Sequence, residues 1–342
     1  MTEPRLVAGA AGPAPNEYDA DIIILALERA RDTVAAIRSA CAQQGVASHV
    51  FVLDQGSCPF TLRKLAAVAA GHPNVTLLGV DRNLGVAGGR NLLSDLGHGR
   101  IIVALDNDAA FATPDTVARL VAALDAEPRL AAIGCRIVTH ADGTDDVSSW
   151  GYPSRLLPCA GEGFDTVTFV GAGHAIRRTA WTQAGGYDPA LFFCWEEYDF
   201  CLRAIALGWR IRYRGDIAIH HKVAPEQRVG WTASRWFYFV RNRIYIERKL
   251  GRSWLALLPR IVGYLLKGCR GRMPAQTLRA LAAARRMAPP ARPHPMPPAA
   301  ALYLQRNDSA HRGSLLHRFT HEALGRIGRG TVAATAGRQP SG

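Results

Sequence analysis

The sequence has no apolar run of the roughly 18 to 20 residues that a transmembrane helix needs. Its N-terminus also lacks the basic segment and the apolar core of a signal peptide. The seven cysteines are odd in number and form no C-x-x-C pair, so the sequence indicates neither a disulfide framework nor a zinc site. We therefore expect reduced thiols and a cytoplasmic protein, either free or peripheral on the inner face of the cell membrane.

Acidic residues are scarce in the last third of the chain. Residues 228–342 contain 21 Lys and Arg but three Asp and Glu, a net charge of +18, whereas residues 1–227 contain 20 and 25 and carry −5. A hydrophobic content of 48% with 20% charged residues is typical of a globular protein. The composition predicts a folded body with a basic tail, and such a tail binds an anionic partner such as a membrane surface, a nucleic acid or an acidic polymer.

Short apolar segments alternate with helix-like segments in the first half of the chain. Strands are expected at 21–25, 49–53, 75–80 and 101–105, with helices at 28–44, 59–70 and 113–126. Because strand and helix alternate in units of about 30 residues, the sequence predicts an α/β domain with a doubly wound, mostly parallel sheet. Later segments predict strands or extended chain at 131–138, 169–178, 209–213 and 216–219, and a helix at 196–207.

Two aspartates separated by one residue follow the apolar run at 101–105. That run is typical of a strand buried on both faces, and it stops at Asp106 and Asp108. Ligands bind at the carboxyl edge of open α/β sheets, where two carboxylates can hold a hard divalent cation that contacts phosphate oxygens. Asp and Asn are also ordinary turn formers, so the pair alone leaves both interpretations open.

Two further clusters each have a functional and a plain structural interpretation. A glycine-rich turn at 81–91 leads into a helix and could bind an anion through backbone N–H groups, or simply join strand to helix. It matches neither the P-loop nor the dinucleotide fingerprint. Glu196 and Glu197 begin a helix, where a carboxylate can act as a general base or merely complement the helix dipole.

Three motifs occur in a fixed order along the chain. They are Asp-Gln-Gly-Ser at 54–57, Asn-x-Gly-x-x-Gly-Gly-x-Asn at 83–91 followed by Leu-Asp-Asn-Asp at 105–108, and Gly-Gly-Tyr-Asp, Phe-Phe and Trp-Glu-Glu-x-Asp-Phe-x-x-Arg within 185–203. Together they resemble family 2 inverting glycosyltransferases of the GT-A fold, most of all bacterial rhamnosyltransferase-like members that build cell-surface glycans. The likeness spans residues 21–249. It departs after the first strand, where the sequence at 26–29 is Ala-Leu-Glu-Arg and not a Tyr-Asn-Arg-like segment.

The resemblance implies roles on the donor side of the site. Asp54 is similar to the acid that reads the nucleobase, and the stretch that contacts nucleoside and diphosphate includes Asn83, Gly85 and Arg90. Asp106 and Asp108 match the D-x-D motif, which holds Mg²⁺ or Mn²⁺ and, through Asp106, the donor. His220 is similar to the downstream histidine that completes the metal shell, and His221 stays open as the alternative.

The resemblance also implies the acceptor side and the chemistry. Glu197 occupies the position of the general base, with Glu196 as the alternative, and Gly173 and Trp195 are expected beside the acceptor. Arg203, four residues after Asp199 on the expected helix, is predicted to pair with that aspartate and not with substrate. The implied activity is metal-dependent, inverting transfer of a hexose or deoxyhexose from a nucleotide-diphosphate sugar to a hydroxyl of a glycan or lipid-linked acceptor in polysaccharide synthesis.

Two other functions compete with this one. A nucleic-acid-binding protein would interleave basic and stacking aromatic residues, which only 231–248 approaches, so no nucleic acid is expected. A sugar nucleotidyltransferase would share the sheet and the metal, but that class usually has a glycine-rich basic loop after the first strand, and residues 27–30 contain no glycine.

The expected domains follow the composition. Residues 1–19 are expected to be a flexible leader, 20–227 the GT-A catalytic domain, 228–269 an aromatic and basic helical extension, and 270–342 a Pro/Ala/Arg-rich linker with a short basic helix at 314–327. Within the extension, the apolar stretch 254–266 is interrupted by Pro259 and flanked by cations. It could lie on an anionic membrane, pack on the catalytic body or make a dimer contact. On the first interpretation, the intact chain binds anionic liposomes in a salt-sensitive way and a version ending near Arg252 does not. The oligomeric state stays open.

Overall fold

The computed structural model describes residues 3–14, 16–222, 232–287 and 296–312. The strands are β1 (Arg5–Gly9), β2 (Ala20–Ala26), β3 (Ser48–Asp54), β4 (Val75–Gly79), β5 (Ile101–Leu105), β6 (Ala109–Phe111), β7 (Leu130–Thr139), β8 (Gly163–Thr166), β9 (Gly173–Arg177) and β10 (Arg210–His221). The helices are α1 (Ala30–Cys41), α2 (Pro59–Ala69), α3 (Gly85–Leu96), α4 (Thr116–Ala126), α5 (Arg178–Ala184), α6 (Glu196–Ala206), α7 (Ala233–Lys249), α8 (Trp254–Arg270), α9 (Pro274–Arg286) and α10 (Pro298–Asn307).

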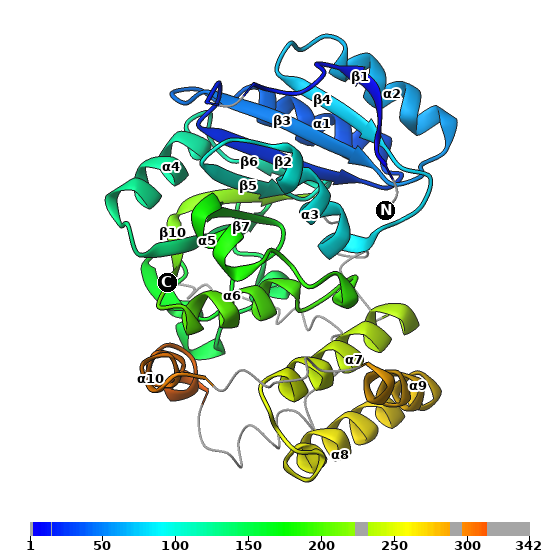
Figure 1. Cartoon of the computed structure of the whole chain (residues 1–342), viewed down its shortest axis with the longest axis vertical. Helices are drawn as coiled ribbons and strands as arrows, with labels where there is room; N and C mark the ends of the chain where they lie inside the picture. The colour runs from blue at the N-terminus through cyan, green and yellow to red at the C-terminus, as the bar shows by residue number, and fades with distance from the viewer. Residues whose placement is uncertain (1–2, 15, 223–231, 288–295, 313–342) are drawn as a thin grey trace, which may run out of the picture.

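The strands form one mixed sheet in the order β1-β4-β3-β2-β5-β9-β7-β10-β6, with β8 paired to β10 (Figure 1). β2, β3, β4 and β5 are parallel to one another, and β10 is parallel to β7. The predicted doubly wound, mostly parallel sheet is therefore confirmed. β9 runs antiparallel between β5 and β7, so its first residue lies beside the last residue of β5.

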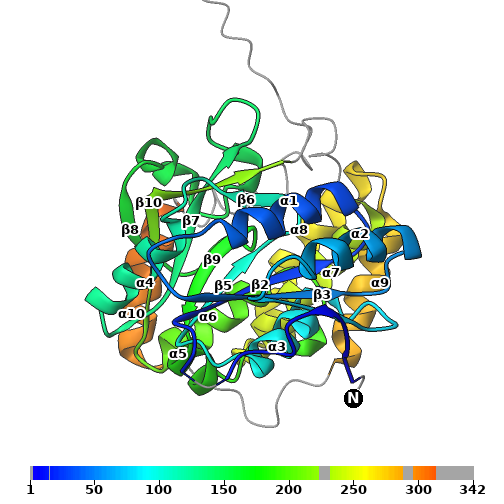
Figure 2. The same ribbon diagram turned by 90° about the horizontal axis from the view of Figure 1, so that it is seen from above.

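Helices cover both faces of the sheet because its strands are apolar on both sides (Figure 2). Ile22 and Ile24 of β2 pack in one core with α1, α2 and α4, while Ile23 points the other way into a core with α3, α5 and α6. A strand alternates its side chains, so each of these helices needs only one apolar face. The burial on both sides holds the carboxyl ends of β3, β5 and β10 at one edge.

Three expected boundaries differ from the structure. Residues 5–9, expected in the flexible leader, form β1, which occupies the open edge of β4 through an antiparallel ladder. The two strands expected at 209–213 and 216–219 are one strand, β10, with an irregularity where Arg214 is followed in the ladder by Ala218. The expected linker contains two helices, α9 from Pro274 and α10 from Pro298. Proline is tolerated at the first position of a helix, because the N–H that it lacks would have no partner within the helix.

The C-terminal helices α7, α8 and α9 form a small bundle beside the sheet domain (Figure 1). Trp236 of α7, Leu257 and Tyr264 of α8 and Ala280 of α9 share its core. Pro259 does not end the apolar stretch, because α8 continues through it to Arg270. The basic helix expected at 314–327 lies outside the described residues. Among the residues that the structure describes, no helix combines the length and hydropathy required to cross a bilayer.

Candidate active site

Asp54 and the loop after β4 form one wall of the site. The Asp54 Oδ2 atom accepts hydrogen bonds from the backbone of Gly56 (3.3 Å) and Ser57 (3.1 Å), while its buried Oδ1 has no partner among the described residues. Gln55 Oε1 accepts from the Leu84 backbone at 2.8 Å, which ties the loop after β3 to the loop before α3. An unpaired buried carboxylate oxygen costs free energy unless a donor reaches it, so Asp54 is suited to a ligand N–H.

The helix α3 begins in close contact with the segment that precedes α6. Asn83 Oδ1 accepts from the Gly85 backbone at 2.7 Å, and Val86 N donates to Phe192 O at 2.7 Å. Gly85 has a φ of 74°, and a Cβ at this position would lie 2.3 Å from Phe192 O. Only glycine allows this approach. The contact brings two motifs together that are about 100 residues apart.

Arg90 is the centre of the site. Its side chain is 3% exposed, and its Nη2 donates to Asp106 Oδ1 at 2.8 Å and to the backbone oxygen of Gly171 at 2.7 Å, while Nη1 pairs with Glu197 Oε1 at 3.3 Å. Burial opposes its charge, but Asp106 first, and then Tyr187 and Glu197, outweigh that effect and raise the pKa of Arg90. A buried guanidinium thus joins the D-x-D carboxylate to the carboxylate expected to be the base. The resemblance had placed Arg90 in a donor-contacting stretch, and here it binds protein groups.

Glu196 and Glu197 are adjacent in sequence but have different surroundings. Glu197 faces Arg90 and Gly171, and a Cβ at position 171 would lie 2.4 Å from its Oε1. Glu196 is 2% exposed, and its Oε2 has no partner among the described residues. Burial raises the pKa of Glu197, an effect that Arg90 opposes, and burial with the adjacent Glu197 raises the pKa of Glu196 well above its ordinary value. Of the two glutamates, Glu197 is the one that forms an ion pair with Arg90 among the described residues.

Asp108 lies in a second polar cluster. It pairs with Arg29 and with His221, whose Nε2 is 3.5 Å from Asp108 Oδ1, and His221 Nδ1 is 2.9 Å from Asp146 Oδ2. Burial opposes a charge on His221, but Asp108 and Asp146 outweigh it and raise its pKa to about 9. Burial also acts against a charged Asp108, and His221 with Arg29 outweighs it, so the pKa of Asp108 is lowered.

The structure distinguishes the two histidines at the end of β10. His221 is the one beside Asp108, whereas the His220 ring contacts that of His140, with their centroids 5.7 Å apart. Successive residues of a strand point to opposite faces, so the two cannot share a site. The resemblance favoured His220, but the geometry places the alternative, His221, in the cluster. Sequence reasoning had no signal for the register that decides this.

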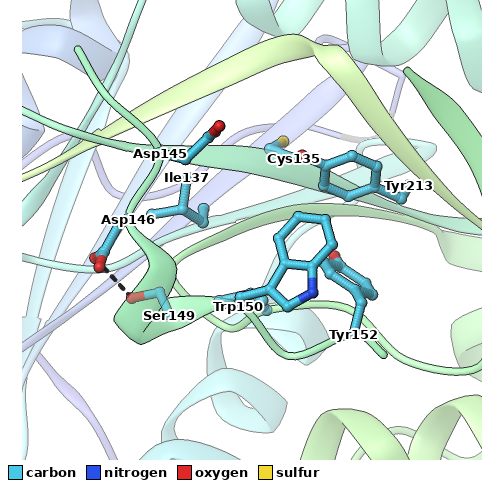
Figure 3. Close-up of a pocket in the computed structure, with 9 residues that line it drawn as sticks. Cys135, Ile137, Asp145, Asp146, Ser149, Trp150, Tyr152 and Tyr213 are labelled. Carbon is cyan, nitrogen blue, oxygen red and sulfur yellow. Dashed lines mark hydrogen bonds between the residues drawn. The ribbon is translucent and has the colours of Figure 1, made fainter. Parts of the chain in front are cut away.

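A small pocket adjoins this cluster through Asp146 (Figure 3). The residues that line it are Cys135, Ile137, Asp145, Asp146, Ser149, Trp150, Tyr152, Val170 and Tyr213. Ser149 donates to Asp146 Oδ2 at 2.8 Å, so the loop that follows β7 orients the carboxylate that holds His221. Neither Asp146 nor this aromatic pocket was predicted from the sequence.

Asp106, Asp108 and His221 suit a hard divalent cation in part. Among the described residues, no three His, Cys, Asp or Glu side chains converge as a ready-made metal cage. Mg²⁺ commonly binds one or two carboxylates together with substrate phosphates, so such a cage is not required. The Asp106 side chain is 41% exposed, which leaves it accessible beside the 14% exposed Asp108. The donor set of two carboxylates at a strand end therefore fits a metal whose other ligands are phosphate oxygens and water.

The residues expected on the acceptor side have mainly structural contacts. Gly173 starts β9, where a Cβ would lie 2.4 Å from the Ile219 side chain. Trp195 donates through Nε1 to Phe239 O at 3.0 Å and packs under the Arg243 guanidinium. The predicted pair of Asp199 and Arg203 is confirmed at 2.9 Å.

Asn242 of α7 holds the segment that precedes the two glutamates. Its Nδ2 lies within hydrogen-bond distance of the backbone oxygens of Leu191 (2.9 Å), Phe193 (2.8 Å) and Cys194 (2.8 Å), so its two N–H groups are shared among three acceptors. The segment is strained, since Phe192, Cys194 and Trp195 have φ values of 62°, 71° and 73°. The fully buried Asn242 thus fixes the start of α6 from outside the catalytic motif. No sequence pattern indicated this role.

This architecture, a doubly wound sheet with a D-x-D pair at its carboxyl edge and an acidic helix start facing it, is the GT-A fold. The solved structures that share it include a mannosyltransferase, PcManGT, from Pyrobaculum calidifontis in complex with GDP-Man and Mn²⁺. Its TM-score is 0.54 at 19% identity, and the match covers 91% of this chain and 86% of that one. Another is GalNAc-T7 with UDP, GalNAc and Mn²⁺, with a TM-score of 0.56 at 14% identity and a match that covers 91% of this chain and 57% of that one. At these identities the likeness concerns the fold alone.

Residues 21–184 match the family model described as Glycosyl transferase family 2, so the chain contains a domain of that family. It is also 35% identical over 125 residues to the succinoglycan biosynthesis protein ExoO of Rhizobium meliloti (strain 1021). That alignment covers 36% of this chain and 35% of the relative, so the chain matches about a third of that protein's length. The family predicted from the three motifs is confirmed, whereas nothing in these comparisons distinguishes a rhamnosyltransferase.

Proposed function

We propose that the protein is an inverting, metal-dependent glycosyltransferase that moves a sugar from a nucleotide diphosphate to a hydroxyl of a glycan or lipid-linked acceptor. The observation that carries this proposal is the single buried guanidinium of Arg90, which pairs with both Asp106 and Glu197. It sets a base at a fixed position relative to the D-x-D pair. A nucleotidyltransferase needs no such base, and a nucleic-acid-binding protein needs neither group.

Glu197 is the general base in this proposal. In an inverting transfer the acceptor hydroxyl attacks the anomeric carbon on the face opposite the leaving diphosphate, and its proton must go to a nearby carboxylate. Burial raises the pKa of Glu197 toward the working range of a base, while Arg90 keeps the carboxylate oriented. Gly171 leaves room for this carboxylate, because any side chain there would collide with it.

Asp106 and Asp108 are the residues that would hold Mg²⁺ or Mn²⁺, and His221 could join them only after losing the proton that Asp108 and Asp146 favour. A bound divalent cation offsets the charge of a leaving diphosphate without proton transfer. Arg29 and His221 neutralise Asp108 from the protein side, and Asp146 orients His221 through Nδ1. Asp54 is positioned to accept an N–H of the nucleobase through its unpaired Oδ1. Asn83 and Gly85 shape the loop between these two parts.

The fold relatives support this choice of ligands. Their structures contain Mn²⁺ with GDP-Man in one case and with UDP and GalNAc in the other, and the relative ExoO is described as a succinoglycan biosynthesis protein. We therefore propose that this protein also uses a nucleotide-sugar donor and a divalent metal, and that it acts in polysaccharide synthesis. The resemblance favours a deoxyhexose such as rhamnose as the transferred sugar.

A thermal-shift screen of UDP-, dTDP- and GDP-sugars with and without Mn²⁺ tests the proposal. The matching donor is expected to raise the melting temperature in the presence of metal, since a ligand at 100 times its Kd adds about 2.7 kcal/mol of stability. Asp108→Ala should abolish this shift and the sugar transfer. Asp125→Ala is the matched control and should retain both, because it removes from α4 an exposed carboxylate that pairs with Arg100.

The outcomes separate the parts of the proposal. Full transfer activity in EDTA would contradict the metal role, and a product with the donor's anomeric configuration, read by NMR, would contradict inversion. A screen in which no nucleotide sugar shifts the wild-type protein or is consumed by it would remove the transferase proposal itself.

A further inference from the structure

α8 presents an apolar stripe on its outer face. Five of its side chains are exposed, at Trp254 (38%), Leu255 (80%), Leu258 (52%), Val262 (38%) and Leu266 (48%). From Leu255 onward they are three or four residues apart, which places them on one side of the helix. The opposite side, with Leu257 and Tyr264, is buried against α7 and α9. α8 can therefore offer only this one face to a partner.

The bundle around the stripe has no acidic surface. Residues 233–286 contain 13 Lys and Arg and a single acid, Glu247, a net charge of +12. Glu247 is 3% exposed and is ion-paired with Arg243 at 2.9 Å and Arg252 at 2.8 Å, so it contributes no negative surface. At the start of the stripe, the Arg248 guanidinium lies 5.3 Å from the centre of the Trp254 ring. The exposed apolar stripe thus belongs to a strongly basic bundle whose one acid is buried and ion-paired.

We propose that this face of α8 docks in the plane of an anionic lipid bilayer. Leucine side chains can enter the boundary between headgroups and acyl chains, while an indole ring and Arg or Lys side chains favour the level of anionic headgroups. A second copy of the chain would bring a bundle of the same strong positive charge against this one. A nucleic acid would pair with the cations but would leave the leucines in water. It would also stack its bases on exposed aromatic rings, and Trp236 of the bundle is fully buried and cannot provide one.

The position of the bundle gives the docking a consequence. α7 packs against α9 in the bundle, and its Asn242 holds the segment that leads to Glu197. A membrane under α8 would therefore contact the same helical bundle that holds this segment, and such an arrangement would suit a lipid-linked acceptor. This consequence rests on the proposed function, whereas the docking itself does not, and vesicle binding can be measured without any catalysis.

Sedimentation of the full chain with vesicles tests the docking. We expect binding to vesicles of phosphatidylglycerol and phosphatidylcholine in equal parts, loss of that binding at high salt, and no binding to pure phosphatidylcholine. The double variant Leu255→Ser/Leu258→Ser should bind at least about tenfold more weakly, because two leucines no longer enter the bilayer. Leu6→Ser/Leu207→Ser removes two leucines of comparable exposure (51% and 56%) from the catalytic domain and should bind like wild type.

Substitutions are a sharper test than truncation after Arg252. A chain that ends there loses α9, whose Thr277 Oγ1 accepts the Trp236 Nε1 hydrogen bond at 2.8 Å, and it exposes the core of the bundle. The proposal is overturned if the full chain ignores anionic vesicles at low salt, or if the stripe variant binds them as wild type does. It is also overturned if light scattering shows that the wild-type protein is a dimer and the stripe variant a monomer, while vesicle binding is equal in the two proteins or absent in both.

Discussion

At the scale of single residues, the pairing with Arg90 separates two neighbouring glutamates. Because Arg90 contacts Glu197 and not Glu196, we expect Glu197→Gln to lower turnover by about 10² or more, the scale of a lost general base. The amide keeps the size of the side chain, so donor affinity should stay within a few-fold of wild type. Steady-state kinetics with a donor titration provides the measurement.

Glu196→Gln is the matched control for that variant. It removes a buried carboxyl with an oxygen that has no partner among the described residues. The pKa of this carboxyl is raised well above its ordinary value, which favours its protonated form, so a neutral amide is a close substitute. Turnover should fall far less than in Glu197→Gln. An inactive Glu196→Gln enzyme beside an active Glu197→Gln enzyme would exchange the two roles.

At the scale of elements, α7 is joined to the catalytic segment by one amide. Asn242→Leu keeps the branching of the side chain but removes the amide donor of the Phe193 and Cys194 backbone oxygens, while Leu191 O still accepts from Arg241 at 2.9 Å. The two oxygens lie in the segment that has three residues with positive φ. We expect kcat to fall by about tenfold or more as the start of α6 relaxes, with a smaller change in the KM for the donor. The far-UV circular dichroism should be unchanged, since α7 keeps its apolar contacts.

Asn307→Leu provides the comparison for this prediction. Among the described residues the Asn307 amide donates within its own helix, to Tyr303 O at 3.0 Å, so its loss should leave kcat as in wild type. If Asn242→Leu lowered the melting temperature but not kcat, the amide would have a structural role and no part in positioning Glu197.

At the scale of the whole molecule, one buried histidine makes global stability depend on pH. His49 of β3 is 1% exposed, bonded through Nε2 to Thr76 Oγ1 at 2.8 Å, and burial lowers its pKa from 6.5 to about 4, with Glu17 opposing the shift. The unfolded chain takes up this proton first as the pH falls. His49 should therefore contribute a decrease in the free energy of unfolding between about pH 6.5 and 4, on the order of 3 kcal/mol at about 1.4 kcal/mol per pKa unit. His174, which is also 1% exposed and whose pKa burial also lowers, acts in the same direction.

Urea unfolding over this pH range measures the effect. His49→Gln can still donate to Thr76 but does not titrate, so its free energy of unfolding should fall less steeply below pH 6.5, even if it is lower at every pH. His98→Gln changes an exposed histidine and should keep the wild-type slope. Equal slopes in all three proteins would show that His49 is not kept neutral in the folded state.

Much of the molecule could be predicted from the sequence, because strands and helices depend on the spacing of apolar residues that are neighbours in the chain. The apolar run at 101–105 is typical of a strand buried on both faces, and β5 with its five buried residues confirms it. Pairing at i and i+4 on a helix brought Asp199 to Arg203 as predicted. The flexible leader was predicted wrongly at 5–9, since these residues become a strand only when β4 offers an open edge.

By itself, the sequence determined which residue types stand at the ends of β3, β5 and β10 and at the start of α6, because alternation and apolar periodicity depend on neighbours in the chain. Only the tertiary structure decided that Arg90 joins Asp106 to Glu197, that His221 and not His220 lies beside Asp108, and that Asn242 holds the segment before α6. Each of these depends on the register of a strand or the packing of a distant helix. The packing of the whole core sets such contacts, and residues far apart in the chain contribute to that packing, so no local sequence pattern can predict them.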